Sequence, residues 1–232
     1  MKLPLPTGPA AHQQIGAGKQ DVETIDQVAH AAWESEDSDS DYIYKREQLA
    51  SLTGRKLHKK RNHVNHFRKT YPGWHYEDIC EGNRHNALTI AARWLAEREN
   101  PGQAEQLEYD SIEFALENRE RMGLFGGILY ADGKPAAMTI ASAVSLDCVD
   151  VHFEKAIGPY ADHGAFVAVN QCFAASDAAS AYDYVNREED MGMTGLRRAK
   201  ESYYPICKLK KYYGEIGSLR KGESIQERVE SV

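Results

Sequence analysis

The sequence predicts a main domain of the α+β class, in which a mixed sheet is built with helices between its strands. Three observations predict this class. Several short segments alternate apolar and polar residues as strands do, the pair Asp132-Gly133 between two apolar runs signals a central hairpin, and other segments carry apolar residues at helical spacing. The chain has 232 residues, 42% of them hydrophobic, and is therefore long enough to bury a core.

Local signals justify the single elements of this domain. Pro72 ends the first helix, Pro101-Gly102 closes a later one, and Gly123 is the expected C-cap of the helix that follows. Thr194 is the expected N-cap of the last helix. The expected elements, in order, are a helix over 55–70, a strand over 74–79, helices over 85–100 and 104–123, hairpin strands over 124–131 and 136–146, a strand over 148–156, a helix over 164–176, a strand over 182–186, a helix over 194–203 and a strand over 206–216.

Residues 1–41 differ from the rest of the chain. An amphipathic helix is predicted over 21–33, and the acidic run 34–41 is predicted to be a solvated, mobile loop because it carries no apolar residue to bury. This segment is thin for an independent domain. We therefore expect the main domain over 42–216 and a disordered tail over 217–232.

Several classes of protein are disfavoured by the sequence. The longest nearly apolar stretch, 136–144, is too short to cross a bilayer, and the first residues lack the apolar segment of a signal peptide, so we expect no transmembrane segment and a cytoplasmic location. The four cysteines are scattered without zinc or redox spacing, which favours reduced thiols over disulfides or a metal site, and no metal ligands are assigned. The sequence contains no P-loop, dinucleotide fingerprint, nucleophile elbow or HExxH motif.

The predicted helix 55–70 concentrates positive charge in an acidic protein. The formal net charge is -7, yet residues 54–71 hold seven Lys or Arg, three His and no acid. One interpretation is a solvated cationic face with Lys60 extended along the core edge. The other is a phosphate-binding surface for RNA or coenzyme A, in which Lys59, Lys60 and Arg61 contact the ligand.

The predicted strand 148–156 divides its side chains between two faces. Alternation places Val149, Val151 and Phe153 on one face and three ionisable residues on the other, namely Asp150, His152 and Glu154. The ionisable face is either exposed to solvent or lines a cleft. In a cleft, His152 or Glu154 would act as a general base toward an amine or hydroxyl. The loop after the strand, which ends at His163 and Gly164, leads into a helix whose N-terminus can hold a phosphate.

A third polar segment follows the predicted strand 182–186. Asn186 lies at the end of that strand, Arg187 follows it, and Lys200 lies on the next helix. The alternatives are a polar surface loop with a salt-bridged helix, or a binding site at the edge of the sheet. We expect Arg187 and Lys200 to hold a carboxylate or phosphate in one cleft with Asn186 and the ionisable residues of strand 148–156.

Two long stretches resemble a known family. The segments "DYIYKREQLASLTGRKLHKKRNHVNHF" and "YVNREEDMGMTGLRRAKESYYP", with "VHFEKA" and "VNQCFA" between them, are similar to the bacterial family grouped with the C-terminal domain of phosphatidylglycerol lysyltransferase. The resemblance spans roughly residues 41–213. It implies a GNAT-like acyl-CoA N-acyltransferase fold, related to Fem-type aminoacyltransferases. Such enzymes move an acyl or aminoacyl group from coenzyme A or a charged tRNA to an amine or hydroxyl of a lipid, peptide or small molecule.

The resemblance also implies roles and departures. Family members carry two GNAT halves, so residues 1–41 would be the remnant and acidic linker of a first half in an N-terminally truncated chain. The basic helix would meet donor phosphates, His152 or Glu154 would take the proton, and Tyr203 or a backbone N–H near Gly164 would stabilise the oxyanion. The usual pyrophosphate loop is only loosely matched by residues 158–164, which leaves aminoacyl-tRNA open as donor.

Three hypotheses follow from this resemblance. The first is an acyl- or aminoacyltransferase that uses aminoacyl-tRNA or coenzyme A as donor, has no other assigned cofactor, and can contact a membrane peripherally. The second is a catalytically inactive GNAT-like module that binds RNA or a partner through the basic helix. The third is a broken paralogue without activity.

Overall fold

The structure, a computed structural model, describes residues 14–219, and within this range the chain forms two compact units. The larger unit comprises residues 42–188 and 193–208, and the smaller one takes the described residues before 42, residues 189–192 and those after 208. The larger unit begins at Tyr42, but residues 209–216, which we expected in the main domain, belong to the smaller unit. No helix among residues 14–219 is long and apolar enough to cross a membrane.

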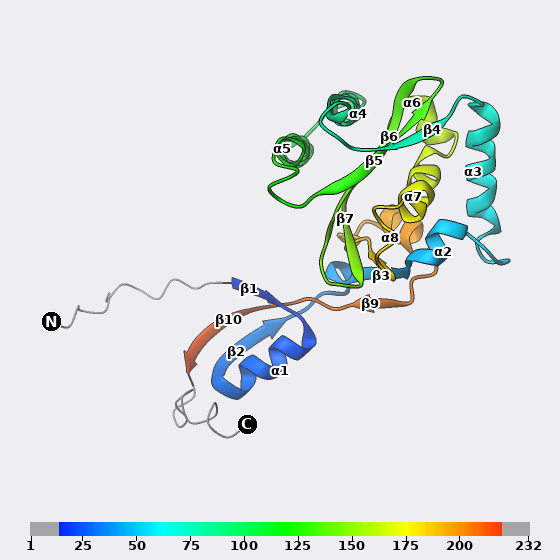
Figure 1. Cartoon of the computed structure of the whole chain (residues 1–232). Coiled ribbons are helices and arrows are strands. Elements are labelled where there is room, and N and C mark those ends of the chain that lie inside the picture. Colours follow the sequence, from blue (N-terminus) through cyan, green and yellow to red (C-terminus); the bar gives the residue numbers. More distant parts are fainter. Residues whose placement is uncertain (1–13, 220–232) are drawn as a thin grey trace. The chain divides into compact units, whose positions relative to one another are not determined.

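The larger unit is built on a seven-stranded mixed sheet (Figure 1). The strand order is β4-β5-β6-β7-β8-β3-β9, with antiparallel pairs from β4 to β7 and a parallel pair β7–β8. The elements are β3 (Asp41–Lys45), α2 (Arg46–Ser51), α3 (His58–Thr70), β4 (His75–Asp78), α4 (Arg84–Ala96), α5 (Gln103–Glu117), β5 (Phe125–Ala131), β6 (Lys134–Ala143), β7 (Cys148–Ala156), α6 (Gly158–Asp162), α7 (Ala165–Ala175), β8 (Tyr184–Asn186), α8 (Thr194–Glu201) and β9 (Cys207–Leu209). The predicted mixed α+β class is confirmed.

The central hairpin forms where its turn residues predict it. Asp132 and Gly133 both adopt positive φ, at 49° and 77°, as the tight turn between β5 and β6 requires. Strand β7 then pairs antiparallel with β6, as expected. This hairpin anchors its part of the sheet in the core, because apolar residues of β5 and β6 pack on both faces of the sheet.

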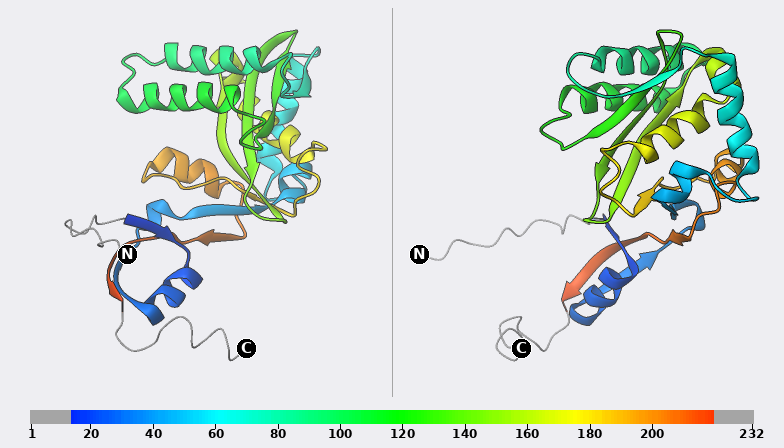
Figure 2. Two further views of the ribbon diagram at one scale, coloured as in Figure 1. Left: turned by 60° about the vertical axis from the view of Figure 1, so that its left-hand side comes forward. Right: turned by 45° about the vertical axis from the view of Figure 1, so that its right-hand side comes forward.

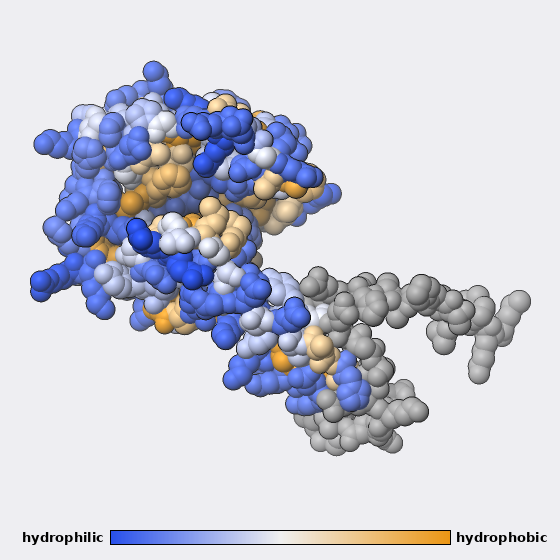
Figure 3. Space-filling model, turned by 180° about the vertical axis from the view of Figure 1, so that it is seen from behind, coloured by the Kyte–Doolittle hydropathy of each residue, from blue (hydrophilic) through white to orange (hydrophobic). Residues whose placement is uncertain are grey.

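Helices cover both faces of the sheet (Figures 1 and 2). On one face, α4 and α5 pack against a cluster that includes Met138 and Ile140 of β6. On the other face, α3 and α7 pack against Leu129 of β5 and Ala137 of β6, while α2 contributes Leu49 to a neighbouring cluster. Seen from behind, the surface is mostly hydrophilic, and hydrophobic residues gather in a hollow of it (Figure 3).

A bulge in β7 corrects the predicted division of its side chains. Ile140 pairs with Phe153 and Ala141 pairs with Val151, which leaves His152 as an extra residue. Alternation restarts after the bulge, so His152 and Phe153 both face α5, whereas Val151 and Glu154 both face α7. The prediction that His152 and Glu154 share one face is therefore wrong.

The smaller unit contains a three-stranded sheet in the order β1-β10-β2. Its elements are β1 (Gln14–Ala17), α1 (Lys19–Val28), β2 (Ala29–Glu34), the 3-10 turn η1 (Asp37–Asp39) and β10 (Tyr212–Leu219). Here the sequence predictions are partly wrong, since the expected helix 21–33 ends at Val28 and continues as a strand, and the expected strand 206–216 divides into β9 and β10. Residues 217–219 belong to β10 and not to a tail, while 1–13 and 220–232 lie outside the described residues.

Candidate functional site

A basic groove lies between α3 and α8. It has a volume of about 1180 Å³. Its lining includes cationic and imidazole side chains but no carboxylate; the basic residues are Arg55, Lys56, His58, Lys59, Lys60, His63 and Arg198. Such a lining attracts anions strongly, because no acid neutralises it locally.

The amphipathic pattern of α3 builds one wall of this groove. Val64 and Phe67 are buried on the inner stripe of the helix, so Lys59 is exposed on the outer side. Lys60 falls at the edge of the buried stripe, as its spacing predicts, and is half-buried. The helix therefore offers exposed cations and one shielded lysine to the same groove.

Lys60, which lines the groove, also lies against a buried aromatic ring beneath it. Its Nζ is 3.9 Å from the centroid of the Tyr203 ring, and Cζ of Arg187 is 4.8 Å from the same centroid. Burial and the nearby charge of Arg187 lower the pKa of Lys60 to about 8. A lysine with this pKa is partly neutral just above neutral pH and is able to accept a proton.

Glu154 forms a shielded ion pair with Arg187. Its Oε1 accepts a hydrogen bond from Nη2 of Arg187 at 2.8 Å, and its Oε2 accepts one from Nδ2 of Asn170 at 3.0 Å. Both side chains of the pair are 12% exposed. Burial acts to lower the pKa of Arg187, but Glu154, Tyr203 and Tyr44 together outweigh burial, and the pKa is raised. Because both oxygens of Glu154 already accept hydrogen bonds, the contacts favour a role in positioning Arg187 over the predicted role as a base.

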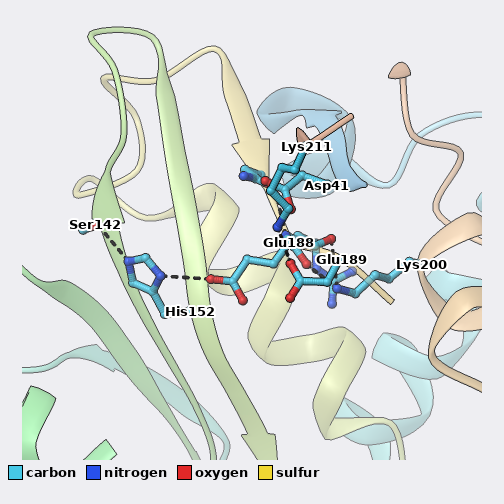
Figure 4. A network of polar contacts seen from close by, with 9 residues as sticks. Asp41, Ser142, His152, Glu188, Glu189, Lys200 and Lys211 are labelled. Atoms are coloured by element: carbon cyan, nitrogen blue, oxygen red, sulfur yellow. Dashed lines mark hydrogen bonds and ion pairs between the residues drawn. The ribbon is translucent and has the colours of Figure 1, made fainter. Parts of the chain in front are cut away.

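His152 belongs to a separate network on the α5 face (Figure 4). Its Nδ1 lies 3.1 Å from Oε1 of Glu188, and its Nε2 lies 2.8 Å from Oγ of Ser142. The hydrogen bond to Glu188 raises the pKa of His152 against the opposing effect of burial, and the charge of Asp150 adds to the rise. This network borders a second groove of about 640 Å³ that contains Leu107 and other apolar residues.

Two predicted ligand-binding residues instead hold the backbone that presents Glu188. Oδ1 of Asn186 accepts the N–H of Glu188 at 2.8 Å. The Nζ of Lys200 donates to the carbonyl of Glu188 at 3.1 Å and also to the carbonyl of Arg187. Lys200 is 8% exposed, so these contacts place it in the interior and not in the basic groove.

Three further predicted residues have local structural partners. Nη1 of Arg61 donates to the carbonyls of Leu52 and Gly54, which satisfies the end of α2. Nδ1 of His163 lies 2.7 Å from the hydroxyl of Tyr71. The N–H of Gly164 itself donates to the carbonyl of Ala161 at 3.1 Å and is therefore already paired.

The predicted single cleft is therefore not formed. Lys59 and Lys60 line the basic groove, and the buried Tyr203 contacts Lys60 from beneath it. Arg187, which is paired with Glu154, lies next to Tyr203. His152 faces the α5 side of the sheet and Glu154 faces the α7 side, because the bulge in β7 lies between them. Ser142, Asn170, Glu188 and Arg198 were not predicted as site residues, although each contacts or lines one of the two sites. Only Glu188 and Arg198 lie in segments with a signal in the sequence, a dense run of charges.

Comparisons with known proteins agree with this architecture. Residues 14–214 match the family described as "Phosphatidylglycerol lysyltransferase, C-terminal". A conserved protein of unknown function from Bacteroides thetaiotaomicron is 36% identical, with a TM-score of 0.74 over 86% of this chain and 66% of that chain. No curated protein matches the chain significantly.

Two more distant structures share the fold. The C-terminal domain of a putative lysylphosphatidylglycerol synthetase from Agrobacterium fabrum is 14% identical, with a TM-score of 0.59 over 85% of this chain and 65% of that one. The structure titled L-PGS from Bacillus licheniformis is 13% identical, with a TM-score of 0.59 over 91% of this chain and 68% of that one. The chain thus spans about two thirds of the length of each structure, and its fold is of the GNAT-like α+β type.

Proposed function

Because the chain belongs to the family of phosphatidylglycerol lysyltransferase C-terminal domains, we propose that it transfers an aminoacyl group from a charged tRNA to an amine or hydroxyl acceptor. Coenzyme A is the alternative donor, since its phosphates suit the same surface. The family supports transferase activity in general. Two features support the choice of donor and the place of the reaction, namely the basic groove and the cluster of side chains beneath it.

The basic groove is the observation that carries this proposal. It gathers cations from two helices that are far apart in the sequence, with Lys59 on α3 and Arg198 on α8, in a chain whose formal net charge is -7. Phosphate contacts of this kind bind and orient a nucleic acid without reading its sequence. That property suits an enzyme that must accept the aminoacyl end of its donor. A long polyanion uses both walls of such a groove, which favours tRNA over the smaller coenzyme A.

The cluster beneath the groove supplies groups for the transfer step. In our mechanism the neutral acceptor amine attacks the ester carbonyl, and neutral Lys60 takes the proton from the attacking nitrogen. Once protonated, Lys60 carries positive charge beside Arg187 next to the Tyr203 ring, so the oxyanion of the tetrahedral intermediate is stabilised there. The bond between the carbonyl carbon and the ribose oxygen then breaks, and Lys60 returns the proton to the ribose oxygen. Glu154 keeps Arg187 in place through the hydrogen bond of 2.8 Å.

Binding of fluorescent tRNA tests the groove. Lys59→Glu with Lys60→Glu should weaken the affinity at least about tenfold, which equals roughly 1.4 kcal/mol. Lys45→Glu with Lys69→Glu is the matched control, because it makes the same charge change at exposed positions outside the groove lining. The control should weaken binding less than about threefold, and wild-type affinity should fall steeply with salt. Equal losses in both double variants would contradict the assignment.

The donor and the activity are separated by two further measurements. Coenzyme A added in excess should not displace tRNA if tRNA is the donor, whereas full displacement would favour coenzyme A. Transfer is then measured as movement of a radiolabelled aminoacyl group from tRNA to phosphatidylglycerol vesicles or to a soluble amine. Binding without transfer to any acceptor would favour the inactive RNA-binding module.

A further inference from the structure

On the α5 face of the sheet, Ser142, His152 and Glu188 form a hydrogen-bonded relay, and we propose that it activates Ser142 as the nucleophile of a second site that hydrolyses neutral esters with an apolar acyl chain. This inference is independent of tRNA binding. It uses a different groove and residues that the proposed aminoacyl transfer does not employ.

The geometry of the relay is that of a nucleophile, a base and an orienting carboxylate. Oγ of Ser142 is 2.8 Å from Nε2 of His152, and Nδ1 of His152 is 3.1 Å from Oε1 of Glu188 (Figure 4). These distances are within the range for an activated serine, and such triads are recognised by geometry and not by sequence order. The residues come from β6, β7 and the segment after β8, so the sheet itself assembles them.

The backbone at Glu188 is held in a conformation that is costly for a non-glycine residue. Its φ is 54°, in the left-handed region. The N–H of Glu188 is fixed by Asn186, and its carbonyl accepts hydrogen bonds from the N–H of Tyr42 and the Nζ of Lys200, both at 3.1 Å. Strain that is secured by several contacts is characteristic of functional sites. Here it directs the carboxylate toward His152.

The bulge in β7 gives the second indication. Ser142 pairs with Asp150, so alternation from Asp150 places His152 on the same α5 face, within hydrogen-bonding distance of Ser142. The extra residue then turns Glu154 to the α7 face, which separates the relay from the ion pair of Glu154 and Arg187. Bulges often re-aim a side chain next to an active site.

The groove beside the relay determines the class of substrate. Its volume of about 640 Å³ is in the range for a small-molecule site. Three apolar side chains of its lining are largely exposed, at 56% for Leu107, 52% for Phe114 and 47% for Met122. The ionisable residues of the lining are His152, Asp110 and Glu188, and the two carboxylates disfavour an anionic acyl group. An apolar, uncharged acyl chain therefore fits this surface.

The reaction follows from these positions. Oγ of Ser142 forms a bond to the ester carbonyl carbon while Nε2 of His152 takes the hydroxyl proton. The bond to the alcohol oxygen breaks, and this oxygen receives the proton from His152. A water molecule then attacks the acyl-serine, again giving its proton to His152, and the carboxylic acid leaves as Ser142 regains its proton. Glu188 stabilises the imidazolium that forms between these steps.

Covalent labelling with a fluorophosphonate tests the relay, because an activated serine displaces fluoride and forms a stable bond to phosphorus. Mass spectrometry should find the label on Ser142. His152→Ala should slow labelling at least about 100-fold and Glu188→Gln about tenfold, as expected for loss of a general base and of its orienting group. Ser111→Ala is the matched control: Ser111 lines the same groove, but its hydroxyl bonds the Leu107 carbonyl, so labelling should be unchanged.

Further measurements separate activation from folding and from metal binding. Circular dichroism checks that each variant is folded. If His152→Ala is unfolded, the pH dependence of labelling in the wild-type protein tests the role of His152 instead. The rate of labelling should rise with pH as His152 loses its proton. Asp150, Glu188 and Asp110 are the acids facing this imidazole or its groove, and Asp150 brings a third ligand atom within 4.8 Å of those of His152 and Glu188. The reaction is therefore run in EDTA. No label on Ser142, labelling independent of His152 and of pH, or loss of labelling in EDTA would each overturn the proposal.

Discussion

The ion pair between Glu154 and Arg187 allows a quantitative test of the site. Each side chain is only 12% exposed, so removing one partner leaves a charge that is neither hydrated nor compensated. Glu154→Gln keeps the size of the side chain and removes its charge, and Arg187→Met removes the guanidinium while filling similar space. Each single substitution should lower the free energy of unfolding by about 3–5 kcal/mol, because breaking a buried pair has this cost.

The double variant carries the decisive information. If the two single losses were independent, their sum would be about 6–10 kcal/mol and would remove most of the stability of an ordinary domain. With both charges gone, no unpaired charge is left, so the double variant should be at least as stable as either single variant. The interaction energy between the two positions should then be about 3 kcal/mol or more.

Urea unfolding measures these free energies. The chain has two compact units, so a signal from the larger unit alone is needed for two-state treatment. Trp74 and Trp94 lie in the larger unit and Trp33 in the smaller, which makes Trp33→Phe a suitable background for tryptophan fluorescence. Equal m-values among the variants are required for the comparison. Additive losses within about 0.5 kcal/mol would show that the pair is not coupled and would refute the reasoning.

Two other predictions concern the groove and its support. Gly164 has a φ of 102°, and a Cβ at this position would lie 2.6 Å from the carbonyl oxygen of His63. Gly164→Ala should therefore lower the free energy of unfolding by about 2 kcal/mol or more. A loss below about 0.5 kcal/mol in urea unfolding would contradict the close approach of α3 and α7. Because the pKa of Lys60 is lowered to about 8, tRNA affinity at constant salt should fall as the pH rises from 7 to 9. The variant Lys60→Arg stays charged over this range and should remove the fall. A pH dependence that Lys60→Arg leaves unchanged would refute the assignment.

The sequence predicted the larger unit well where local signals and tertiary packing agree. The turn at Asp132-Gly133, the proline that follows α3 and the apolar alternation of β5 and β6 placed these elements within a few residues. The smaller unit was harder to predict, because Ala29 to Glu34 read as the continuation of a helix. That segment is a strand because it pairs with β10, a partner about 180 residues away that no local signal reveals.

The site was predicted only in part for a similar reason. Helical spacing alone predicts where Lys59 and Lys60 lie on α3, and both line the groove, while their contact with a donor stays a prediction. Glu154 was wrongly assigned to the face of His152, because a bulge depends on pairing with the neighbouring strand and leaves no mark in the alternation of "CVDVHFEKA". Glu188 owes its orientation to contacts from Asn186, Tyr42 and Lys200, which are distant in sequence or hidden in a polar run.

The bulge also bears on how this strand tolerates insertions and deletions during evolution. In a regular strand, losing one residue inverts every side chain beyond it and exposes the core. The bulge in β7 is different because it already contains one residue more than the facing strand. Deleting His152 would restore a regular ladder and leave Glu154 and the residues after it facing as they do now. Deleting the single codon of His152 is therefore expected to keep the ion pair of Glu154 with Arg187. The two faces of the sheet can thus diverge separately.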